Sequence, residues 1–280
     1  MGKLAAVDVG TNTALLLITE DGRAIHERHE VTRLGEGVAA SGALSKDAMT
    51  RTLAVLHEFD SERQAHGAEW AGAVATAAVR SASNGRAFLM MAGAVGVPLQ
   101  VISGEEEAAF AFVSVAHEPP SEEPLIVFDV GGGSTEIISE HGAVSLPVGS
   151  VRLRETHGDD VAAMRAEIRA GLAAVPVAQG ALVGLAATVT SLAALELHTT
   201  DSAQIHHSRL TRKAVADQLE ALMKMPLAVR AKLPELHPDR ADLIVAGAAI
   251  VLEVMEHFQA TEMFVSDRGV RWGLIYANEA

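Results

Sequence analysis

Apolar and polar positions follow one another along this chain in short runs, and one arrangement of runs occurs twice. Near the N-terminus, an apolar run at Leu4–Val9 contains Asp8; a Gly-Thr-Asn-Thr segment, a second apolar run and a turn at Glu20-Asp-Gly22 follow. The same order recurs in the middle of the chain around Asp129, and it ends in a turn at Glu140-His-Gly142. The two aspartates are 121 residues apart and the two turn glycines 120. Short runs rich in Val, Ile and Leu are typical of strands, so the sequence predicts a strand–loop–strand–turn–strand unit in two copies.

Longer amphipathic stretches follow each copy and alternate with further apolar runs. The longest begins at Ser45, a residue type suited to cap a helix, and reaches about His66. The other expected helices lie at about residues 84–94, 103–115, 159–174, 211–224, 240–257 and from 270, with a further helix start at 188–192; strands are expected at 70–75, 99–102, 143–147, 181–185 and 261–265. Strands that alternate with helices predict an α/β fold with mixed sheets.

A proline-rich segment, His117–Pro124, is the clearest linker in the chain. It divides the sequence into an expected first lobe, residues 1–117, and a second lobe, residues 118–280. We expect the two Asp-bearing loops to face a cleft between these lobes. The last helix is a candidate to pack back on the first lobe.

A glycine-rich loop follows the strand that ends near Asp129. Three glycines, Gly131–Gly133, are followed by Ser134, Thr135 and Glu136. Glycines allow close approach of a ligand to the backbone, and successive amides in such a loop suit an anion. The flanking carboxylates of Asp129 and Glu136 suit a divalent cation instead. The pattern therefore indicates a metal ion together with a phosphate group, although a glycine-rich hairpin with no ligand has the same pattern.

The composition narrows the class of protein. Of the 280 residues, 49% are hydrophobic and none is cysteine, which excludes disulfides, thiolate metal sites and thiol nucleophiles and fits a reducing compartment. Asp8 interrupts the first apolar run, so no signal peptide is expected, and the longest apolar run, Leu243–Leu252, is far shorter than the roughly 20 residues of a membrane span. We therefore expect a cytoplasmic protein without membrane partners.

The net charge of −14 is spread along the chain, and no block of Lys and Arg occurs. A binding surface for duplex nucleic acid is therefore not expected. A polyanionic substrate would have to bind through a metal ion and a few placed arginines.

Several segments, in order, resemble the exopolyphosphatase and guanosine pentaphosphate phosphohydrolase family, a branch of the actin, hexokinase and Hsp70 superfamily. Two of them together are highly specific: Ile102-Ser-Gly-Glu-Glu-Glu-Ala108 and Phe128-Asp-Val-Gly-Gly-Gly-Ser-Thr-Glu136. The others are residues 6–13, 32–37, 75–80 with 82–84, 240–247 and 266–273. The resemblance implies two actin-like (ribonuclease H-like) lobes, hydrolysis of a phosphoanhydride bond, and a possible homodimer.

The resemblance also implies roles for individual residues. Glu107 would activate the attacking water, and Arg80 would bind and stabilise the phosphate. Asp129 and Glu136, with Asp8 in the first lobe, would hold Mg²⁺ or another divalent cation. The residues that would contact phosphate are Asn12, Gly131, Gly132, Gly133, Ser134, Thr135 and Arg268.

Some of these and neighbouring residues also have a structural explanation. Ser103 and Glu106 have the spacing of a helix-capping box, so Glu105 and Glu106 are expected to be structural. Arg268 and Arg271 could contact substrate or form salt bridges. The adjacent His206 and His207 lack a metal-ligand spacing and are expected to be solvated.

Three positions depart from the family pattern. Leu15 replaces a residue that is often basic, Ser81 one that is usually acidic, and Ala186-Ala187 a pair of glycines at a helix start. The last change puts in doubt the approach of phosphate to the backbone there. The chain also ends after two lobes, without the extra domains of longer members, so strongly processive action on long polymers is not expected.

These observations predict an exopolyphosphatase that releases orthophosphate from the end of inorganic polyphosphate with Mg²⁺ and a Glu-activated water. The alternative within the same class is hydrolysis of guanosine pentaphosphate. An actin-superfamily kinase and a non-catalytic sensor of phosphorylated ligands are more distant alternatives.

Overall fold

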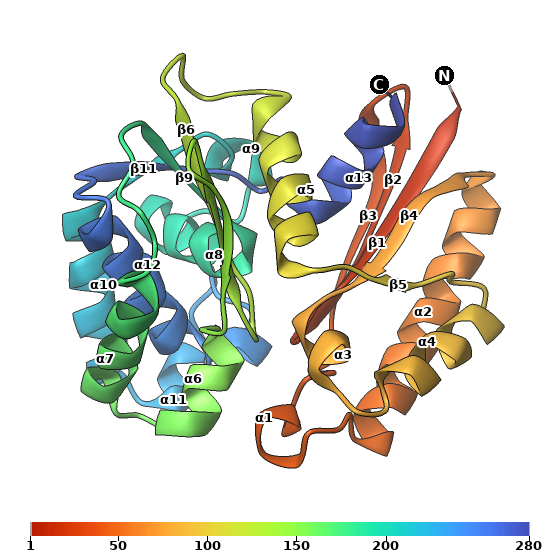
Figure 1. The fold of residues 1–280 in the computed structure, drawn as a ribbon, viewed down its shortest axis with the longest axis horizontal. Helices are drawn as coiled ribbons and strands as arrows, with labels where there is room; N and C mark the ends of the chain where they lie inside the picture. Colours follow the sequence, from red (N-terminus) through yellow and green to blue (C-terminus); the bar gives the residue numbers. More distant parts are fainter. Residues whose placement is uncertain (1, 280) are drawn as a thin grey trace. The chain divides into compact units, whose positions relative to one another are not determined.

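The computed structural model describes residues 2–279, and the chain divides into two compact units (Figure 1). The first unit consists of Met1–Ser114 together with Val270–Ala280, and the second of Val115–Gly269. The boundary near residue 114 falls within helix α5 (Gly104–Ala116), slightly before the expected linker. The first unit therefore takes its last helix from the C-terminal end of the sequence.

The first unit contains a five-stranded sheet with the order β3-β2-β1-β4-β5. The strands are β1 (Lys3–Val9), β2 (Thr13–Glu20), β3 (Arg23–Val31), β4 (Glu69–Ala75) and β5 (Gln100–Val101). The first three form an antiparallel meander, β4 runs parallel to β1, and β5 runs parallel to β4. Asp21 and Gly22 make the β2–β3 turn with φ values of 50° and 75°, as a two-residue turn of type I′ requires.

The second unit contains a six-stranded sheet with the order β10-β11-β9-β6-β7-β8. The strands are β6 (Leu125–Val130), β7 (Thr135–Ser139), β8 (Gly142–Leu146), β9 (Ala181–Leu185), β10 (Arg209–Thr211) and β11 (Glu262–Val265). From β8 to β11, an antiparallel meander is again followed by two parallel strands. The predicted repeat and the mixed α/β fold class are thus confirmed.

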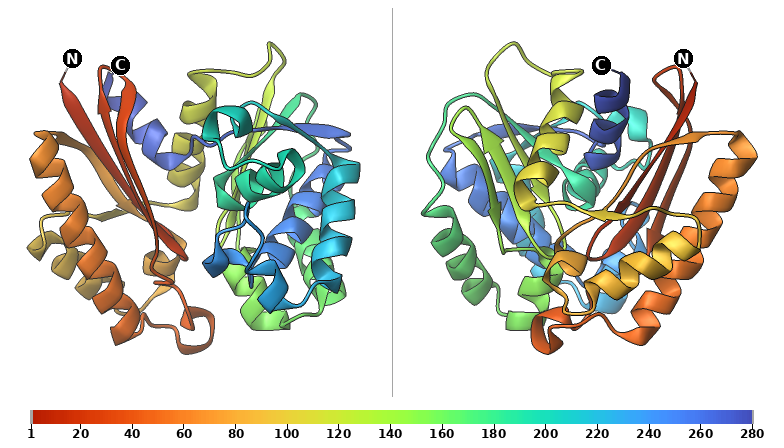
Figure 2. Two further views of the ribbon diagram at one scale, coloured as in Figure 1. Left: turned by 180° about the vertical axis from the view of Figure 1, so that it is seen from behind. Right: turned by 45° about the vertical axis from the view of Figure 1, so that its right-hand side comes forward.

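The residues of β1 alternate between the two faces of the first sheet, and helices pack on both faces. The helices of this unit are α1 (Val38–Ser41), α2 (Lys46–His66), α3 (Ala77–Ser81), α4 (Gly85–Ala94), α5 and α13 (Val270–Glu279). Val7 and its same-face neighbours pack against buried residues of α2 and α4, such as Phe59 and Phe88. Ala6 faces the other way, into a cluster with Trp272 and Ile275 of α13, which lies beside the strands in both views of Figure 2. Asp8 shares the face of Ala6.

One large core fills the second unit. Its helices are α6 (Ser150–His157), α7 (Val161–Leu172), α8 (Ala186–Leu197), α9 (Ser202–Ile205), α10 (Arg212–Lys224), α11 (Leu227–Arg230) and α12 (Ile244–His257), with a short 3₁₀ helix at Pro238–Arg240. Every residue of α12 from Ile244 to Met255 is buried, including Glu253. The Glu253 carboxylate accepts hydrogen bonds from Arg165 and Arg169 of α7. Burial alone would raise the pKa of Glu253, but the two arginines outweigh it and hold the pKa below its ordinary value.

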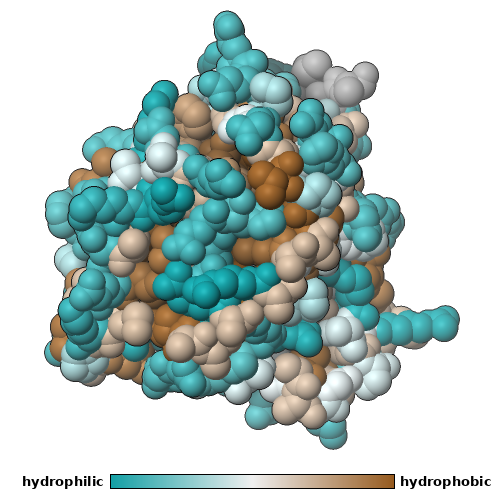
Figure 3. Space-filling model, turned by 60° about the vertical axis from the view of Figure 1, so that its left-hand side comes forward, coloured by the Kyte–Doolittle hydropathy of each residue, from teal (hydrophilic) through white to brown (hydrophobic). Residues whose placement is uncertain are grey.

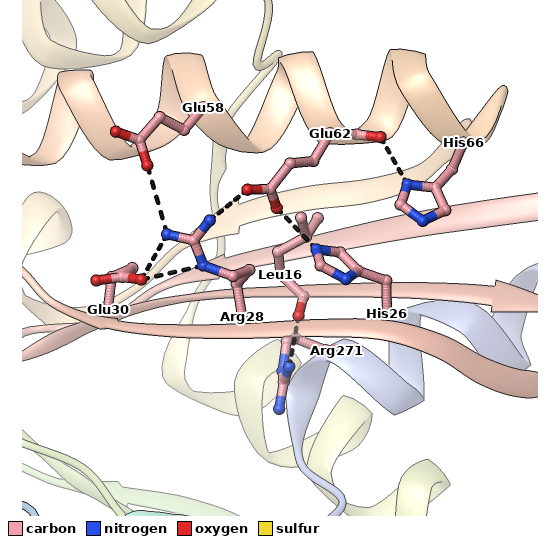
Figure 4. Close-up of polar contacts among 8 residues, drawn as sticks. All are labelled: Leu16, His26, Arg28, Glu30, Glu58, Glu62, His66 and Arg271. Carbon is pink, nitrogen blue, oxygen red and sulfur yellow. Dashed lines mark hydrogen bonds and ion pairs between the residues drawn. The ribbon is translucent and has the colours of Figure 1, made fainter.

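A charged cluster joins β3 to α2 in the first unit (Figure 4). Arg28 donates to Glu30 on its own strand and to Glu62 and Glu58 on the helix. His26 lies 2.8 Å from Glu62 through Nε2, and its ring stacks on that of His66 with centroids 5.0 Å apart. These contacts bind an edge strand to a helix, and no pattern in the sequence predicts them.

The predicted elements differ from the observed ones mainly where they are short. The strand expected at residues 99–102 is only Gln100–Val101, and the helix expected from residue 240 starts at Ile244. Helices α1, α3, α6, α9 and α11 and strand β10 were not predicted, because three to eight residues carry little periodic signal.

No helix among residues 2–279 is long and apolar enough to cross a membrane. On the face drawn in Figure 3, hydrophilic residues predominate and hydrophobic ones form separate patches.

Candidate active site

The first Asp-bearing loop connects β1 to β2 and is held by a second loop. The backbone amides of Thr32 and Arg33 donate to the Asn12 carbonyl at 3.0 and 2.9 Å, and that of Gly35 donates to the Thr11 carbonyl at 2.8 Å. A Cβ at Gly35 would lie 2.3 Å from the Thr11 methyl group, so only glycine allows this contact. The segment of residues 32–37 therefore fixes the shape of the loop.

Asn12 has bonding capacity that the fold leaves unused. Its Oδ1 is buried, and within residues 2–279 it has no hydrogen-bond partner. A buried polar atom without a partner is costly, so it is a natural point of contact for a ligand or its water shell.

Arg80 and Glu107, 27 positions apart, lie together in the first unit. Arg80 is on α3, directly after β4, and Glu107 is on α5. The Arg80 guanidinium donates through Nη1 to Glu107 Oε2 at 3.2 Å and to the Ile102 carbonyl at 2.8 Å. The Glu107 side chain is only 10% exposed, whereas that of Arg80 is 28% exposed. A shielded carboxylate beside a more accessible guanidinium suits a base next to an anion-binding group.

The two glutamates before Glu107 are structural or exposed. The Ser103 amide donates to Glu106 at 2.7 Å, and the Glu106 amide donates to the Ser103 hydroxyl at 3.1 Å, which completes the predicted capping box. Glu105 lies on the surface, where a backbone amide and the Ser103 hydroxyl hold its pKa below the ordinary value. Glu107 is therefore the one of the three that is buried.

The second Asp-bearing loop lies between β6 and β7 and packs on the N-terminus of α6. The amides of Ser150 and Val151 donate to the carbonyls of Gly131 and Gly132 at 3.0 and 2.9 Å. A Cβ at Gly149 would lie 2.4 Å from Gly132, so α6 can approach the loop only through a glycine. Sequence reasoning missed Gly149, and its signal was the Gly-Ser pair directly after a strand.

The glycine loop leaves donors available. In the part of the chain that the structure describes, the amides of Gly132 and Gly133 give no hydrogen bond to a backbone carbonyl. Consecutive amides of this kind form a nest for an anion. Gly131 does not have a positive φ, so close packing and not a left-handed turn explains the glycine at this position. A Cβ there would lie 2.9 Å from the Ser134 carbonyl.

The side chains after the glycines point to different tasks. Ser134 and Thr135 are both buried. The Thr135 hydroxyl donates to the Val148 carbonyl at 2.6 Å, so its proton is used within the fold. Asp129 and Glu136 are direct partners across β6 and β7, which places both carboxylates on one face of the sheet.

Asp129 and Glu136 are oxygen ligands of the kind that a hard divalent cation takes. Among residues 2–279, no three or more His, Asp or Glu side chains gather into a metal cluster. Mg²⁺ is usually held by one or two carboxylates together with waters and substrate phosphates. Glu136 is 1% exposed, and its carboxylate accepts a hydrogen bond from the Ser145 hydroxyl, which holds it in place.

The two arginines before and within the last helix differ in environment. Arg268 Nη1 lies 2.5 Å from Glu118 Oε2 in the second unit. Arg271 is 3% exposed in the first unit, where its Nη1 donates to the Leu16 carbonyl at 2.8 Å (Figure 4). Its Nη2 lies 3.2 Å from His29 Nε2. Arg271 therefore anchors α13 to the sheet.

The prediction of solvated histidines at 206 and 207 is wrong. The His206 side chain is 17% exposed, and its Nδ1 lies 3.0 Å from Asp267 Oδ1. The two imidazole rings stack with centroids 3.9 Å apart. Burial and the neighbouring His206 hold the pKa of His207 below its ordinary value. This pair supports the segment that carries Arg268. The sequence does not reveal this role, because it shows only two adjacent histidines in a loop.

The departure at Ala186 has a structural consequence. Ala186 has φ of 67°, in the left-handed region that glycine occupies most easily. The chain keeps the backbone conformation of a glycine there although a Cβ is present.

Several known proteins are similar to this chain over most of its length. The profile of the Ppx/GppA phosphatase family matches residues 18–280. A protein of Mycobacterium tuberculosis named Exopolyphosphatase 2 is 36% identical over 285 residues, which cover 90% of this chain and 89% of that protein. A crystal structure of the Aquifex aeolicus Ppx/GppA family member is similar with a TM-score of 0.83 and 31% identity, and the match covers 99% of this chain and 97% of that one.

A further structure, of an exopolyphosphatase from Cytophaga hutchinsonii, shares the fold with a TM-score of 0.89 at 23% identity, covering 99% of this chain and 97% of that one. The profile and the Mycobacterium relative both extend over most of the sequence. This chain belongs to the Ppx/GppA phosphatase family.

Proposed function

We propose that this protein is an exopolyphosphatase, which hydrolyses the terminal phosphoanhydride bond of inorganic polyphosphate and releases orthophosphate. The observation that carries the proposal is the contact between Arg80 and Glu107. It joins the candidate base and the candidate phosphate ligand in one place. The name of the Mycobacterium relative supports the choice of substrate.

In this proposal Glu107 accepts the proton of the attacking water. A shielded carboxylate can hold a water in a fixed orientation, and phosphoryl transfer needs mainly that positioning. Arg80 contributes positive charge beside the reacting phosphate, where negative charge spreads over the oxygens in the transition state. Its bond to the Ile102 carbonyl keeps the guanidinium in place.

In the second unit, the amides of Gly132 and Gly133, with Ser134 and Arg268, would bind phosphate oxygens, and Asp129 and Glu136 would hold Mg²⁺. In the first unit, Asn12 is proposed to bind phosphate and Asp8 the cation. When bound, the ion would neutralise charge on the phosphate oxygens.

Orthophosphate release from short polyphosphate, long polyphosphate and guanosine pentaphosphate, assayed side by side with and without Mg²⁺, tests the proposal. We expect Mg²⁺-dependent release from polyphosphate. If the protein prefers guanosine pentaphosphate, that nucleotide and not polyphosphate is the substrate, and the reaction class is unchanged. ADP formation with a sugar acceptor would instead indicate a kinase, and binding without turnover a sensor. A homodimer and a cytoplasmic location stay predictions.

A further inference from the structure

Three polar residues form a row across the meander of the second sheet. Asp129 on β6 pairs with Glu136 on β7, and Glu136 pairs with Ser145 on β8. Direct cross-strand partners point to the same face of a sheet. The neighbours of this row, such as Phe128 and Ile137, point to the opposite face and belong to the large core.

Glu136, in the middle of the row, is hydrogen-bonded by Ser145 at its end. Glu136 is 1% exposed, and its Oε1 accepts a hydrogen bond of 2.7 Å from the Ser145 hydroxyl. Because a hydroxyl has a single proton, this bond commits Ser145 to the carboxylate. A hydrogen bond to an ionised acceptor is stronger than a neutral one, and it fixes the orientation of the carboxylate plane.

We propose that Ser145 is a positioning residue that orients the Glu136 carboxylate for the divalent cation. The inference rests on the proposed function, because it assigns Glu136 to the metal. Outer partners of metal ligands fix the direction of the ligand atoms, and their loss typically lowers metal affinity or activity about 10–100-fold. Ser145 is not expected to touch substrate.

A purely structural role is the competing explanation. In that case the hydroxyl would only satisfy a buried carboxylate, and its removal would lower stability without changing metal binding. Thermal unfolding without metal and metal affinity therefore have to be measured on the same variants.

The test compares Ser145→Ala, Ser145→Thr and the parent protein, with Ser139→Ala as the matched control. Ser139 is in the same sheet, at the opposite end of β7, and its hydroxyl accepts from the His141 amide instead. Mn²⁺ binding is followed by electron paramagnetic resonance in the presence of orthophosphate, and Glu136→Gln identifies the signal of this site.

We expect Ser145→Ala to raise the Mn²⁺ dissociation constant about 10–100-fold. Ser145→Thr keeps the hydroxyl and should stay within about threefold of the parent, as should Ser139→Ala. Unchanged Mn²⁺ affinity in Ser145→Ala overturns the inference, whatever its stability, and so does a Ser145→Thr variant as weak as alanine. Absence of a Glu136-dependent Mn²⁺ site in the parent also overturns it.

The proposed function is judged separately, by phosphate release from the parent. If the parent binds Mn²⁺ through Glu136 but hydrolyses no phosphoanhydride, the proposed function is refuted. The role of Ser145 is then still decided by the Mn²⁺ dissociation constants of its variants.

Discussion

The two copies of the repeat share a scaffold but differ in the residues that the register places side by side. In the first sheet, Asp8 pairs with Leu15 and Leu15 with His29; in the second, the equivalent row is Asp129, Glu136 and Ser145. The first row has a single carboxylate and the second has two with a supporting hydroxyl. The first unit instead has the Arg80–Glu107 pair. Duplication of the fold therefore does not duplicate its residues: the second copy has two paired carboxylates, and the first has a buried glutamate beside an arginine.

The largest expected effect is loss of the base. Glu107→Gln should lower turnover about 10²–10⁴-fold, because a general base typically contributes that much. Mn²⁺ binding should be unchanged if the second unit holds most of the metal ligands. Phosphate-release kinetics and Mn²⁺ titration measure the two properties.

Glu106→Gln is the matched control on the same helix, since glutamine can keep the capping bond and turnover should be near the parent value. Near-normal turnover of Glu107→Gln would contradict the assignment of Glu107 as the general base.

The second test exchanges equivalent aspartates. Asp129→Asn should weaken Mn²⁺ binding more than about 100-fold, because loss of a ligand exceeds the effect of an outer partner. Asp8→Asn should have a smaller effect, since no second carboxylate lies opposite it in the sheet. Equal losses in the two variants would show that the two rows contribute alike.

The third test concerns the arginines around the start of α13. Arg271→Ala should lower the free energy of unfolding by about 2–3 kcal/mol, because it leaves the Leu16 carbonyl without its buried donor. Arg268→Ala should cost less than about 1 kcal/mol, since its partner Glu118 is half exposed. Denaturant titration compares them, and a reversed order would contradict the assignment of Arg271 as the anchor.

The fourth test uses the buried carboxylate of α12. The pKa of Glu253 is lower in the folded protein than its ordinary value of 4.5. A lowered pKa stabilises the fold above the unfolded pKa, and this contribution is lost as the pH falls through the folded value. Glu253→Gln should therefore lower the free energy of unfolding by about 2 kcal/mol at neutral pH, and the difference from the parent should shrink as the pH falls below the ordinary pKa of 4.5.

Thermal unfolding measured from neutral to acid pH checks this, with Glu256→Gln, whose carboxylate is half exposed, as control. A difference that stays constant with pH would mean that ionisation of Glu253 does not contribute.

The smallest effect is expected at Ala186. Ala186→Gly should raise the free energy of unfolding by up to about 1 kcal/mol, because relief of the left-handed strain exceeds the entropy that glycine adds to the unfolded chain. Ala187→Gly is the control and should destabilise, since its φ is not positive. Destabilisation by both glycines would show that the conformation at Ala186 carries no strain.

The sequence was informative where a pattern repeats and uninformative where contacts join distant segments. The repeat around Asp8 and Asp129 predicted both meanders, because apolar periodicity and turn residues act locally. Resemblance to a family, and not periodicity, singled out Arg80 and Glu107. Their contact depends on how the fold brings α3 and α5 together, which no local rule specifies.

The pairing register of the strands accounts for other features that the sequence did not predict. Ser145 attracted no notice in the sequence because a serine in a strand is ordinary. Only the pairing of β7 with β8 shows that it faces Glu136. In the same way, nothing in the sequence distinguished Arg268 from Arg271, since both are arginines beside a helix start. Burial separated them, and burial is decided by the whole fold.

The discontinuity of the first unit also has a consequence for the order of folding. Residues 115–269 form the second unit without a contribution from the rest of the chain. During synthesis from the N-terminus, the second unit can therefore fold while the first still lacks α13, and the apolar face around Ala6 and Leu17 stays uncovered until the end. That face is therefore the part of the first unit most open to non-native apolar contacts before α13 is made.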